Sequence, residues 1–337
     1  MHKSPETVLV LGANGRFGLH TALAFAAAGW RVLAQIRPGK PLNPALLGQS
    51  NIEPLPQALS DIAKLTVVAN NSKVIVNGLH PPYRSWHTEI PKITSLVVSL
   101  ARESGASVIL PGNVYVYGAT MPELLTASTP HHPTNKLGEI RLKMERQYRD
   151  AADDGVRTIL LRIGDFLQRE STGNWFDTHM TRQLGMGRFA YPGRRTIPHA
   201  FGYLPDAARA CVGLAQLRND LPAFADIPFA GTTLSGDQMQ QMIEQALGAK
   251  MKAGHIPWPV IRLLALFNSD MRGVVDMRYL WDTPHRLSDS NLRKWLPDFR
   301  PTPVEKIIED CVSRFAQQSA IKNTTKDGLH QPLTVRH

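Results

Sequence analysis

The chain has 337 residues, of which 43% are hydrophobic and 20% are charged, and its net charge is +10. This length and composition indicate a folded globular protein with one large α/β domain and a smaller lobe. No apolar run approaches the length that spans a bilayer, so we expect no membrane partner. With only two cysteines, Cys211 and Cys311, the sequence argues against a disulfide framework, and we expect no metal site.

The basic residues are dispersed along the chain and do not form a block interleaved with aromatic residues. We therefore expect no nucleic-acid partner, and we assign part of the positive charge to a pocket for phosphates. The first residues run directly into an apolar segment without the hydrophobic region of a signal peptide. This pattern favours a cytoplasmic protein.

Apolar runs alternate with segments of helical periodicity through the first half of the chain. Continuous apolar runs are typical of strands that are buried on both faces of a parallel sheet. They predict six strands, at 7–11, 31–36, near 52, and at 74–77, 107–110 and 158–162. Helices are predicted between them at 16–28, 59–69, 86–103 and 136–153.

This order of elements predicts an α/β fold, a Rossmann-type doubly wound parallel sheet with a smaller C-terminal substrate lobe. We expect residues 1–165 to form the Rossmann domain and residues 166–320 to form a mixed lobe that shares its packing with the sheet. The polar residues 321–337 are expected to be a disordered tail.

A glycine-rich loop follows the first predicted strand and opens the first predicted helix. It contains six candidate cofactor-binding residues, namely Gly12, Asn14, Gly15, Arg16, Phe17 and Gly18. Glycine permits a tight turn and a close approach of the backbone to a pyrophosphate, and the helix N-terminus then offers free N–H groups to the phosphates. The loop predicts an NAD(P)-binding domain. The alternative is a tight strand-to-helix turn without a ligand.

The end of the second strand indicates which dinucleotide binds. NAD-specific proteins usually place an acidic side chain there to bind the ribose 2′-hydroxyl, whereas this chain has Arg37. A guanidinium can pair with a 2′-phosphate, and no acidic residue occurs between Thr7 and Ile52. We therefore expect NADP(H) to be preferred, with NAD(H) possible. The alternative is that Arg37 is a solvated loop residue.

The spacing Gly-x-x-Gly-x-x-Gly is similar to that of the extended and atypical short-chain dehydrogenases, the epimerase and dehydratase relatives. The resemblance covers most of the chain and includes the segments 112–118 and 137–145. It implies an NAD(P)-dependent oxidoreductase or a related enzyme. Besides the glycine loop and Arg37, we assign Asn77, Gly112 and Arg141 to the cofactor site.

The catalytic segment departs from the family pattern in chemically important ways. Asn113 stands at the position of the family's serine, Leu137 at that of its catalytic tyrosine, and Arg141 at that of its lysine. Leucine has no transferable proton, and arginine does not deprotonate in proteins. Asn113, Tyr115 and Lys136 are the candidate catalytic replacements. The alternative roles are packing for Tyr115 and an exposed first-turn position for Lys136.

The leading functional hypothesis is an NADP(H)-binding oxidoreductase that acts on a carbonyl or hydroxyl group of a small molecule, with a homodimer as the candidate assembly. The second hypothesis is an epimerase or dehydratase of a sugar or a nucleotide sugar. The family's Arg-Asp pair, which binds a sugar-nucleotide diphosphate, is replaced here by His199 and Ala200. The third hypothesis is a protein that senses NADP(H) and catalyses no reaction.

Overall fold

The computed structural model describes residues 4–327, with side chains described as far as residue 315. A parallel sheet of seven strands forms its centre, in the order β11-β7-β5-β4-β1-β2-β3. The strands are β1 (Thr7–Leu11), β2 (Arg31–Ile36), β3 (Ile52–Pro56), β4 (Val74–Asn77), β5 (Ser107–Gly112), β7 (Thr158–Arg162) and β11 (Phe224–Pro228). The predicted Rossmann-type doubly wound sheet is therefore confirmed.

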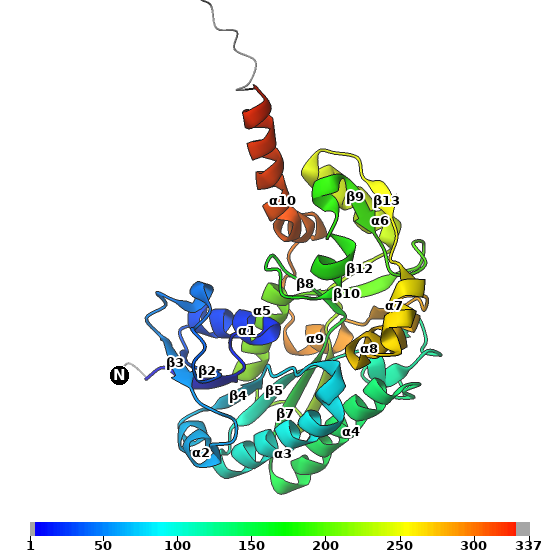
Figure 1. Cartoon of the computed structure of the whole chain (residues 1–337). Coiled ribbons are helices and arrows are strands. Elements are labelled where there is room, and N and C mark those ends of the chain that lie inside the picture. The colour runs from blue at the N-terminus through cyan, green and yellow to red at the C-terminus, as the bar shows by residue number, and fades with distance from the viewer. Residues whose placement is uncertain (1–3, 328–337) are drawn as a thin grey trace, which may run out of the picture.

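Helices cover both faces of this sheet, as Figure 1 shows. On one face α1 and α5 pack against each other, and α2, α3 and α4 share the second core on the other face. The helices, with those of the C-terminal part, are α1 (Arg16–Ala27), α2 (Ile62–Asn70), α3 (Trp86–Ser104), α4 (Lys136–Asp150), α5 (Leu204–Gln216), α6 (Gly236–Leu247), α7 (Trp258–Ala265), α8 (Ser269–Asp276), α9 (Ser290–Trp295) and α10 (Val304–Asp327).

The C-terminal part adds three small sheets and a third apolar core. Strands β12, β10 and β8 form one sheet, β13 pairs with β9, and β14 pairs with β6. Their bounds are β6 (Leu124–Leu125), β8 (Asp165–Leu167), β9 (Arg188–Ala190), β10 (His199–Tyr203), β12 (Thr232–Leu234), β13 (Lys252–Gly254) and β14 (Arg286–Leu287). Among residues 4–327, no helix combines the length and apolar character needed to cross a bilayer.

After residue 165, α5 packs on α1 and β11 extends the central sheet beside β7, so this part of the chain shares its packing with the first domain. The helix α10 includes residues 321–327, which we expected in the tail, and the remainder of that expected tail lies outside the described residues.

The predicted helix at 59–69 begins at Ile62, because Asp61 caps it by accepting a hydrogen bond from the Lys64 N–H.

The strand order reverses between β1 and β4, which lie side by side although β2 and β3 intervene in the sequence. In doubly wound sheets, the carboxyl ends of the strands at such a reversal leave a crevice that binds ligands. Gly12 directly follows β1, and Gly78 directly follows β4. The sheet therefore brings the glycine loop to the expected ligand crevice.

Candidate functional site

A cavity of about 1050 Å³ opens at the carboxyl ends of the central strands. Nine of the ten residues assigned to the cofactor line it, all except Gly18, and so do Asn113 and Tyr115. The structure thus brings together residues from the glycine loop to α4 that lie far apart in the sequence. Two assigned site residues, Gly18 and Lys136, do not line the cavity.

The glycine loop has the geometry of a tight turn, and its glycine positions leave little room for a Cβ. Gly12 has φ +74°, a left-handed conformation that favours glycine. A Cβ on Gly18 would lie 2.2 Å from the Gly12 carbonyl oxygen, so helix α1 can pack this closely only with glycine there. The loop is also closed by a hydrogen bond from the Gly15 N–H to the Gly12 carbonyl, at 2.8 Å.

The N-terminus of α1 points unpaired donors at the cavity. No side chain caps this helix, and within residues 4–327 the Arg16 and Phe17 N–H groups have no acceptor. Free first-turn amides and the positive end of the helix dipole suit a phosphate. This arrangement fits the diphosphate of a dinucleotide.

The side chains of Arg16 and Phe17 are occupied by the protein itself. Phe17 is buried in the core, and the Arg16 guanidinium donates to the carbonyl oxygens of Thr172 (3.1 Å from Nη2) and Gly173 (3.2 Å). Thr172 and Gly173 also line the cavity. If Arg16 and Phe17 contact a phosphate, they would do so through their backbone N–H groups, while the Arg16 side chain ties the glycine loop to the segment after β8.

The loop after β2 is held against the glycine loop. Asn14 donates from Nδ2 to the Pro41 carbonyl and accepts the Asn43 N–H, both at 2.8 Å. Gln35, which sequence reasoning missed, accepts the Gly12 N–H at 2.9 Å. These bonds place Arg37 and Lys40 at the cavity, where both are exposed. Their backbones share a hydrogen bond from the Lys40 N–H to the Arg37 carbonyl (3.1 Å), but neither side chain forms a hydrogen bond or ion pair in the described part of the chain.

Arg141 projects from α4 into the cavity. Its Nη2 donates to the Pro111 carbonyl, but its buried Nε has no partner among the described atoms. An unpaired buried donor at a cavity wall suits a ligand hydroxyl or carbonyl oxygen. Burial lowers the pKa of Arg141, and the nearby Glu145 opposes that effect.

Asn77 and Gly112 form the wall of the cavity at the ends of β4 and β5. The Asn77 amide donates to the Tyr148 hydroxyl at 3.1 Å and accepts the Leu79 N–H at 3.2 Å. Asn77 therefore shapes the turn that follows β4. Gly112 packs directly against β7, because a Cβ there would lie 2.3 Å from the Leu160 side chain.

Two tyrosine hydroxyls meet in the cavity. Tyr115 and Tyr83 lie 3.0 Å apart between their oxygen atoms, and Trp86 stacks beside Tyr115. Burial raises the pKa of both hydroxyls, that of Tyr115 well above its ordinary value. Both groups therefore remain protonated hydrogen-bond donors at neutral pH. Tyr83 was not assigned from the sequence, although it follows β4 at the ligand-binding edge of the sheet.

Asn113 lies beside Tyr115, and its side-chain amide nitrogen is free within the described residues. Its Oδ1 accepts the Tyr115 N–H at 3.1 Å, and its Nδ2 has no acceptor within residues 4–327. This leaves an N–H donor for a ligand carbonyl, the role expected of Asn113. Tyr117, in contrast, is buried against the Arg162 guanidinium and does not line the cavity.

Lys136 points away from the candidate site. It is exposed at the first turn of α4 and is absent from the cavity wall, whereas Leu137 and Arg141 are buried. Residues four apart share a face of a helix, so the face that carries Leu137 and Arg141 directs Lys136 outward. The structure therefore gives Lys136 no contact with a ligand in this cavity.

Asp165 and His80 are two further titratable residues of the cavity wall that were not assigned from the sequence. The Asp165 carboxylate lies 2.7 Å from Nε2 of the buried His199, which stacks on Trp281. Burial lowers the pKa of His80 to about 4, with further lowering from Arg16 and Arg141. His80 is thus a neutral imidazole. The contact with His199 holds the Asp165 carboxylate at the cavity wall.

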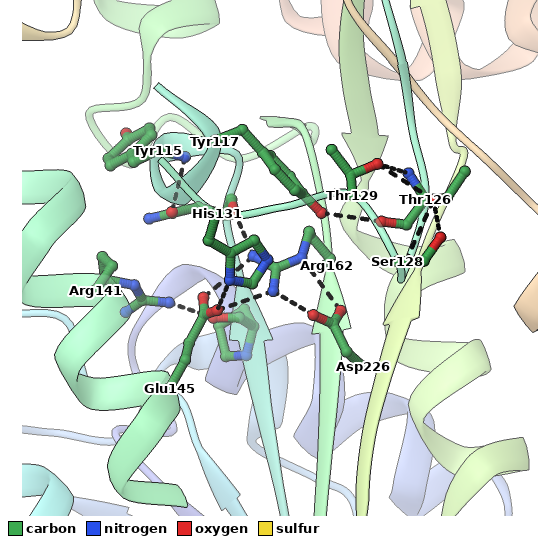
Figure 2. Close-up of polar contacts among 12 residues, drawn as sticks. Tyr115, Tyr117, Thr126, Ser128, Thr129, His131, Arg141, Glu145, Arg162 and Asp226 are labelled. Carbon is green, nitrogen blue, oxygen red and sulfur yellow. Dashed lines mark hydrogen bonds and ion pairs between the residues drawn. The ribbon is translucent and has the colours of Figure 1, made fainter. Parts of the chain in front are cut away.

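A buried ionic network supports the site from behind. Figure 2 shows that Arg162 lies between Glu145 (2.9 Å) and Asp226 (2.5 Å). Arg162 also donates to the Asn113 carbonyl. Burial alone would lower the pKa of Arg162, but the two carboxylates raise it well above its ordinary value. His131 approaches the same carboxylates, yet Arg162 already occupies the position between them that a cation would take.

Comparison with known proteins identifies the fold. No family model and no curated protein matches the chain. Among solved structures, UDP-glucose 4-epimerase from Brucella ovis in complex with NAD is 16% identical with a TM-score of 0.71, covering 92% of this chain and 98% of the epimerase. The UDP-Glc/GlcNAc 4-epimerase from Campylobacter jejuni is 15% identical with a TM-score of 0.70, covering 93% of this chain and 99% of that one.

A third similar structure is the enzyme WbmH from Bordetella bronchiseptica in complex with NAD⁺. It is 14% identical with a TM-score of 0.70, covering 92% of this chain and 98% of WbmH. At these identities the likeness shows the fold, and it confirms the expected resemblance to the extended short-chain dehydrogenases at that level.

Proposed function

We propose that the chain binds NADP(H) in this cavity and catalyses oxidoreduction at a carbonyl or hydroxyl group of a small molecule, in the cytoplasm. One observation carries the cofactor assignment. The free amides at the N-terminus of α1 lie in the same cavity as the unpaired cations Arg37 and Lys40. Together they offer a diphosphate site and a second anion site, as a phosphorylated dinucleotide requires.

The charges at the end of β2 favour a 2′-phosphate over a free ribose hydroxyl. Asp165 and Asp270 are the only acidic residues of the described cavity wall, and they come from β8 and α8. Arg31 does not contribute, because it pairs with Glu53 at 2.8 Å. Arg37 and Lys40 therefore face the ligand without a competing carboxylate.

The reaction centre is proposed at Tyr115, Tyr83 and Asn113. Bound NADPH would supply the hydride. Tyr115 keeps its proton because burial raises the pKa of its hydroxyl, so it can donate a hydrogen bond to a substrate carbonyl oxygen. The Asn113 amide offers a second donor, and the Tyr83 hydroxyl lies within reach to replace a proton that Tyr115 gives up.

An epimerase of nucleotide sugars is the second candidate, favoured by the solved structures of similar fold. Their printed descriptions name UDP-sugar 4-epimerases and complexes with NAD. Against this reading, Leu137 stands at the position of the family's catalytic tyrosine, and His199 is engaged with Asp165. A binding protein without turnover is the third candidate, favoured by the exposed position of Lys136.

The test is NADPH oxidation by the full chain with a panel of aldehydes, ketones and quinones, beside conversion of UDP-glucose to UDP-galactose with NAD. Turnover of a carbonyl compound that falls in Tyr115→Phe, while NADPH affinity persists, supports the proposal. Conversion of UDP-glucose would favour the epimerase. Tight NADPH binding without turnover of any compound would favour the binding protein.

A further inference from the structure

Helix α7 carries an apolar face that no described part of the protein covers. Val260, Leu263, Leu264 and Phe267 are 53%, 61%, 51% and 87% exposed. These positions follow the i, i+3, i+4, i+7 spacing and therefore lie on one side of α7 and the turn after it. Leu266, which is 66% exposed, widens the same surface. We call these five residues the α7 patch.

The opposite side of α7 is the one that packs against the protein. Ile261 and Ala265 are buried, and the Trp258 indole N–H donates to the Pro192 carbonyl at 2.8 Å. The helix thus has two apolar sides, and only the inner side packs against the rest of the protein. An exposed cluster of large apolar side chains marks an interaction surface in a stable protein.

Positive charge borders the α7 patch. Arg262 on α7 and Arg272 on α8 are exposed, and neither has an acidic partner within residues 4–327. The Arg272 guanidinium lies 3.4 Å from the Ala265 carbonyl, at the C-terminal end of α7. The whole chain carries a net charge of +10. An apolar helical face beside unpaired cations suits an anionic bilayer surface.

We propose that the α7 patch docks the protein on the surface of an anionic lipid bilayer. Leu263, Leu264 and Phe267 enter the boundary between headgroups and acyl chains, and Arg262 and Arg272 contact the headgroups. The sequence-based expectation of no membrane partner considered spanning segments only. The docking is peripheral and needs no spanning helix.

A second copy of the chain fits the α7 patch less well. A two-fold interface would place each patch against its own copy, which brings Arg262 and Arg272 close to identical charges. A stable dimer also buries about 800 Å² and about 20 residues on each partner. The α7 patch has five exposed apolar side chains.

The position of the α7 patch relates it to the cavity. Helix α8 packs against α7, and its residues Asp270, Met271 and Val274 line the cavity. Asp270 also pairs with Arg84, which precedes α3. Figure 1 shows α7 at the outer edge of the molecule with α8 beside it. A docked protein therefore holds its cavity one helix away from the bilayer.

The test is co-sedimentation of the full chain with vesicles of phosphatidylcholine, alone or with about one third phosphatidylglycerol. We expect binding to the mixed vesicles that weakens at high salt. The double substitution Leu263→Glu with Phe267→Glu should weaken it at least about tenfold, since each buried side chain contributes that much. Arg262→Gln should weaken binding to the mixed vesicles about fivefold.

Leu47→Glu is the matched control, because Leu47 is 60% exposed and lies after β2, outside the C-terminal part. It should bind as the unchanged protein does, and circular dichroism should show that all variants fold. No binding to either vesicle, or equal binding by the double variant, would overturn the proposal. So would a dimer in sedimentation velocity that the double variant dissociates, because a second copy would then occupy the α7 patch.

Discussion

The imidazole of His199 and the carboxylate of Asp165 form a close pair, with 2.7 Å between Nε2 and Oδ2. The same imidazole stacks on Trp281 at 3.9 Å and meets the ring of His285 at 4.4 Å. His199 and His285 are both buried. Two buried histidines in ring contact therefore lie behind Asp165, a residue of the cavity wall.

The stability of the protein should decrease as the pH falls below 6.5. Burial, with a further effect from His199, lowers the pKa of His285 from 6.5 to about 3. Between these values the unfolded chain binds a proton that the folded chain does not, so the free energy of unfolding falls by about 1.4 kcal/mol per pH unit for this group. His285→Asn should reduce the slope measured in urea titrations, whereas the exposed control His255→Asn should leave it unchanged. An unaltered slope in His285→Asn would contradict this assignment.

Gly18→Ala should abolish dinucleotide binding. The new Cβ would lie 2.2 Å from the backbone carbonyl of Gly12, so α1 must shift and the glycine loop must open. Calorimetric titration with NADPH checks this. The control is Gly105→Asn, at the left-handed C-cap of α3 with nothing within 4 Å, which should bind as the unchanged protein does. Wild-type affinity in Gly18→Ala would show that the loop does not hold the diphosphate.

Arg162→Met should destabilise the fold by about 3–5 kcal/mol, because it leaves Glu145 and Asp226 buried without a cation. Denaturant titration measures this loss. Adding Glu145→Gln and Asp226→Asn to Arg162→Met should recover part of it. In the exposed pair of Arg31 with Glu53, Arg31→Met should cost about 1 kcal/mol or less. Equal losses at Arg162 and Arg31 would be evidence against a stabilising role of the buried network.

Arg37→Asp should weaken NADPH binding roughly tenfold or more, because a charge-assisted contact to the 2′-phosphate is lost and a repulsive charge replaces it. NADH binding should change far less. Calorimetry with both nucleotides checks this difference, with Arg31→Asp as the control because Arg31 is engaged with Glu53. Equal losses for NADPH and NADH in Arg37→Asp would show that Arg37 does not bind the 2′-phosphate.

Most of the central sheet could be predicted because each of its strands has a recognisable local sequence pattern. Thr7–Leu11 is a continuous apolar run and is buried along its whole length. The seventh strand, β11, was missed because Asp226 and Pro228 interrupt its apolar pattern. Asp226 is tolerated there only because Arg162 on the neighbouring strand pairs with it. That compensation is a tertiary contact, which the local pattern does not reveal.

The candidate site likewise contains residues that could be assigned from the sequence and residues that could not. The glycine loop is a contiguous segment, so its residues could be assigned from spacing alone. The pairing of Tyr83 with Tyr115 joins two loops that follow different strands, and only the strand order brings them together. The outward position of Lys136 could have been inferred, because Leu137, Arg141 and Tyr148 mark the buried face of α4.

The most direct test of the central claim is calorimetric titration of the full, folded chain with NADPH and with NADH. The prediction is a single saturable site for NADPH and weaker binding of NADH, because the α1 amides would bind the diphosphate of both nucleotides, whereas Arg37 and Lys40 would contact only the 2′-phosphate of NADPH. Absence of heat and of thermal stabilisation with both nucleotides, oxidised and reduced, would contradict it.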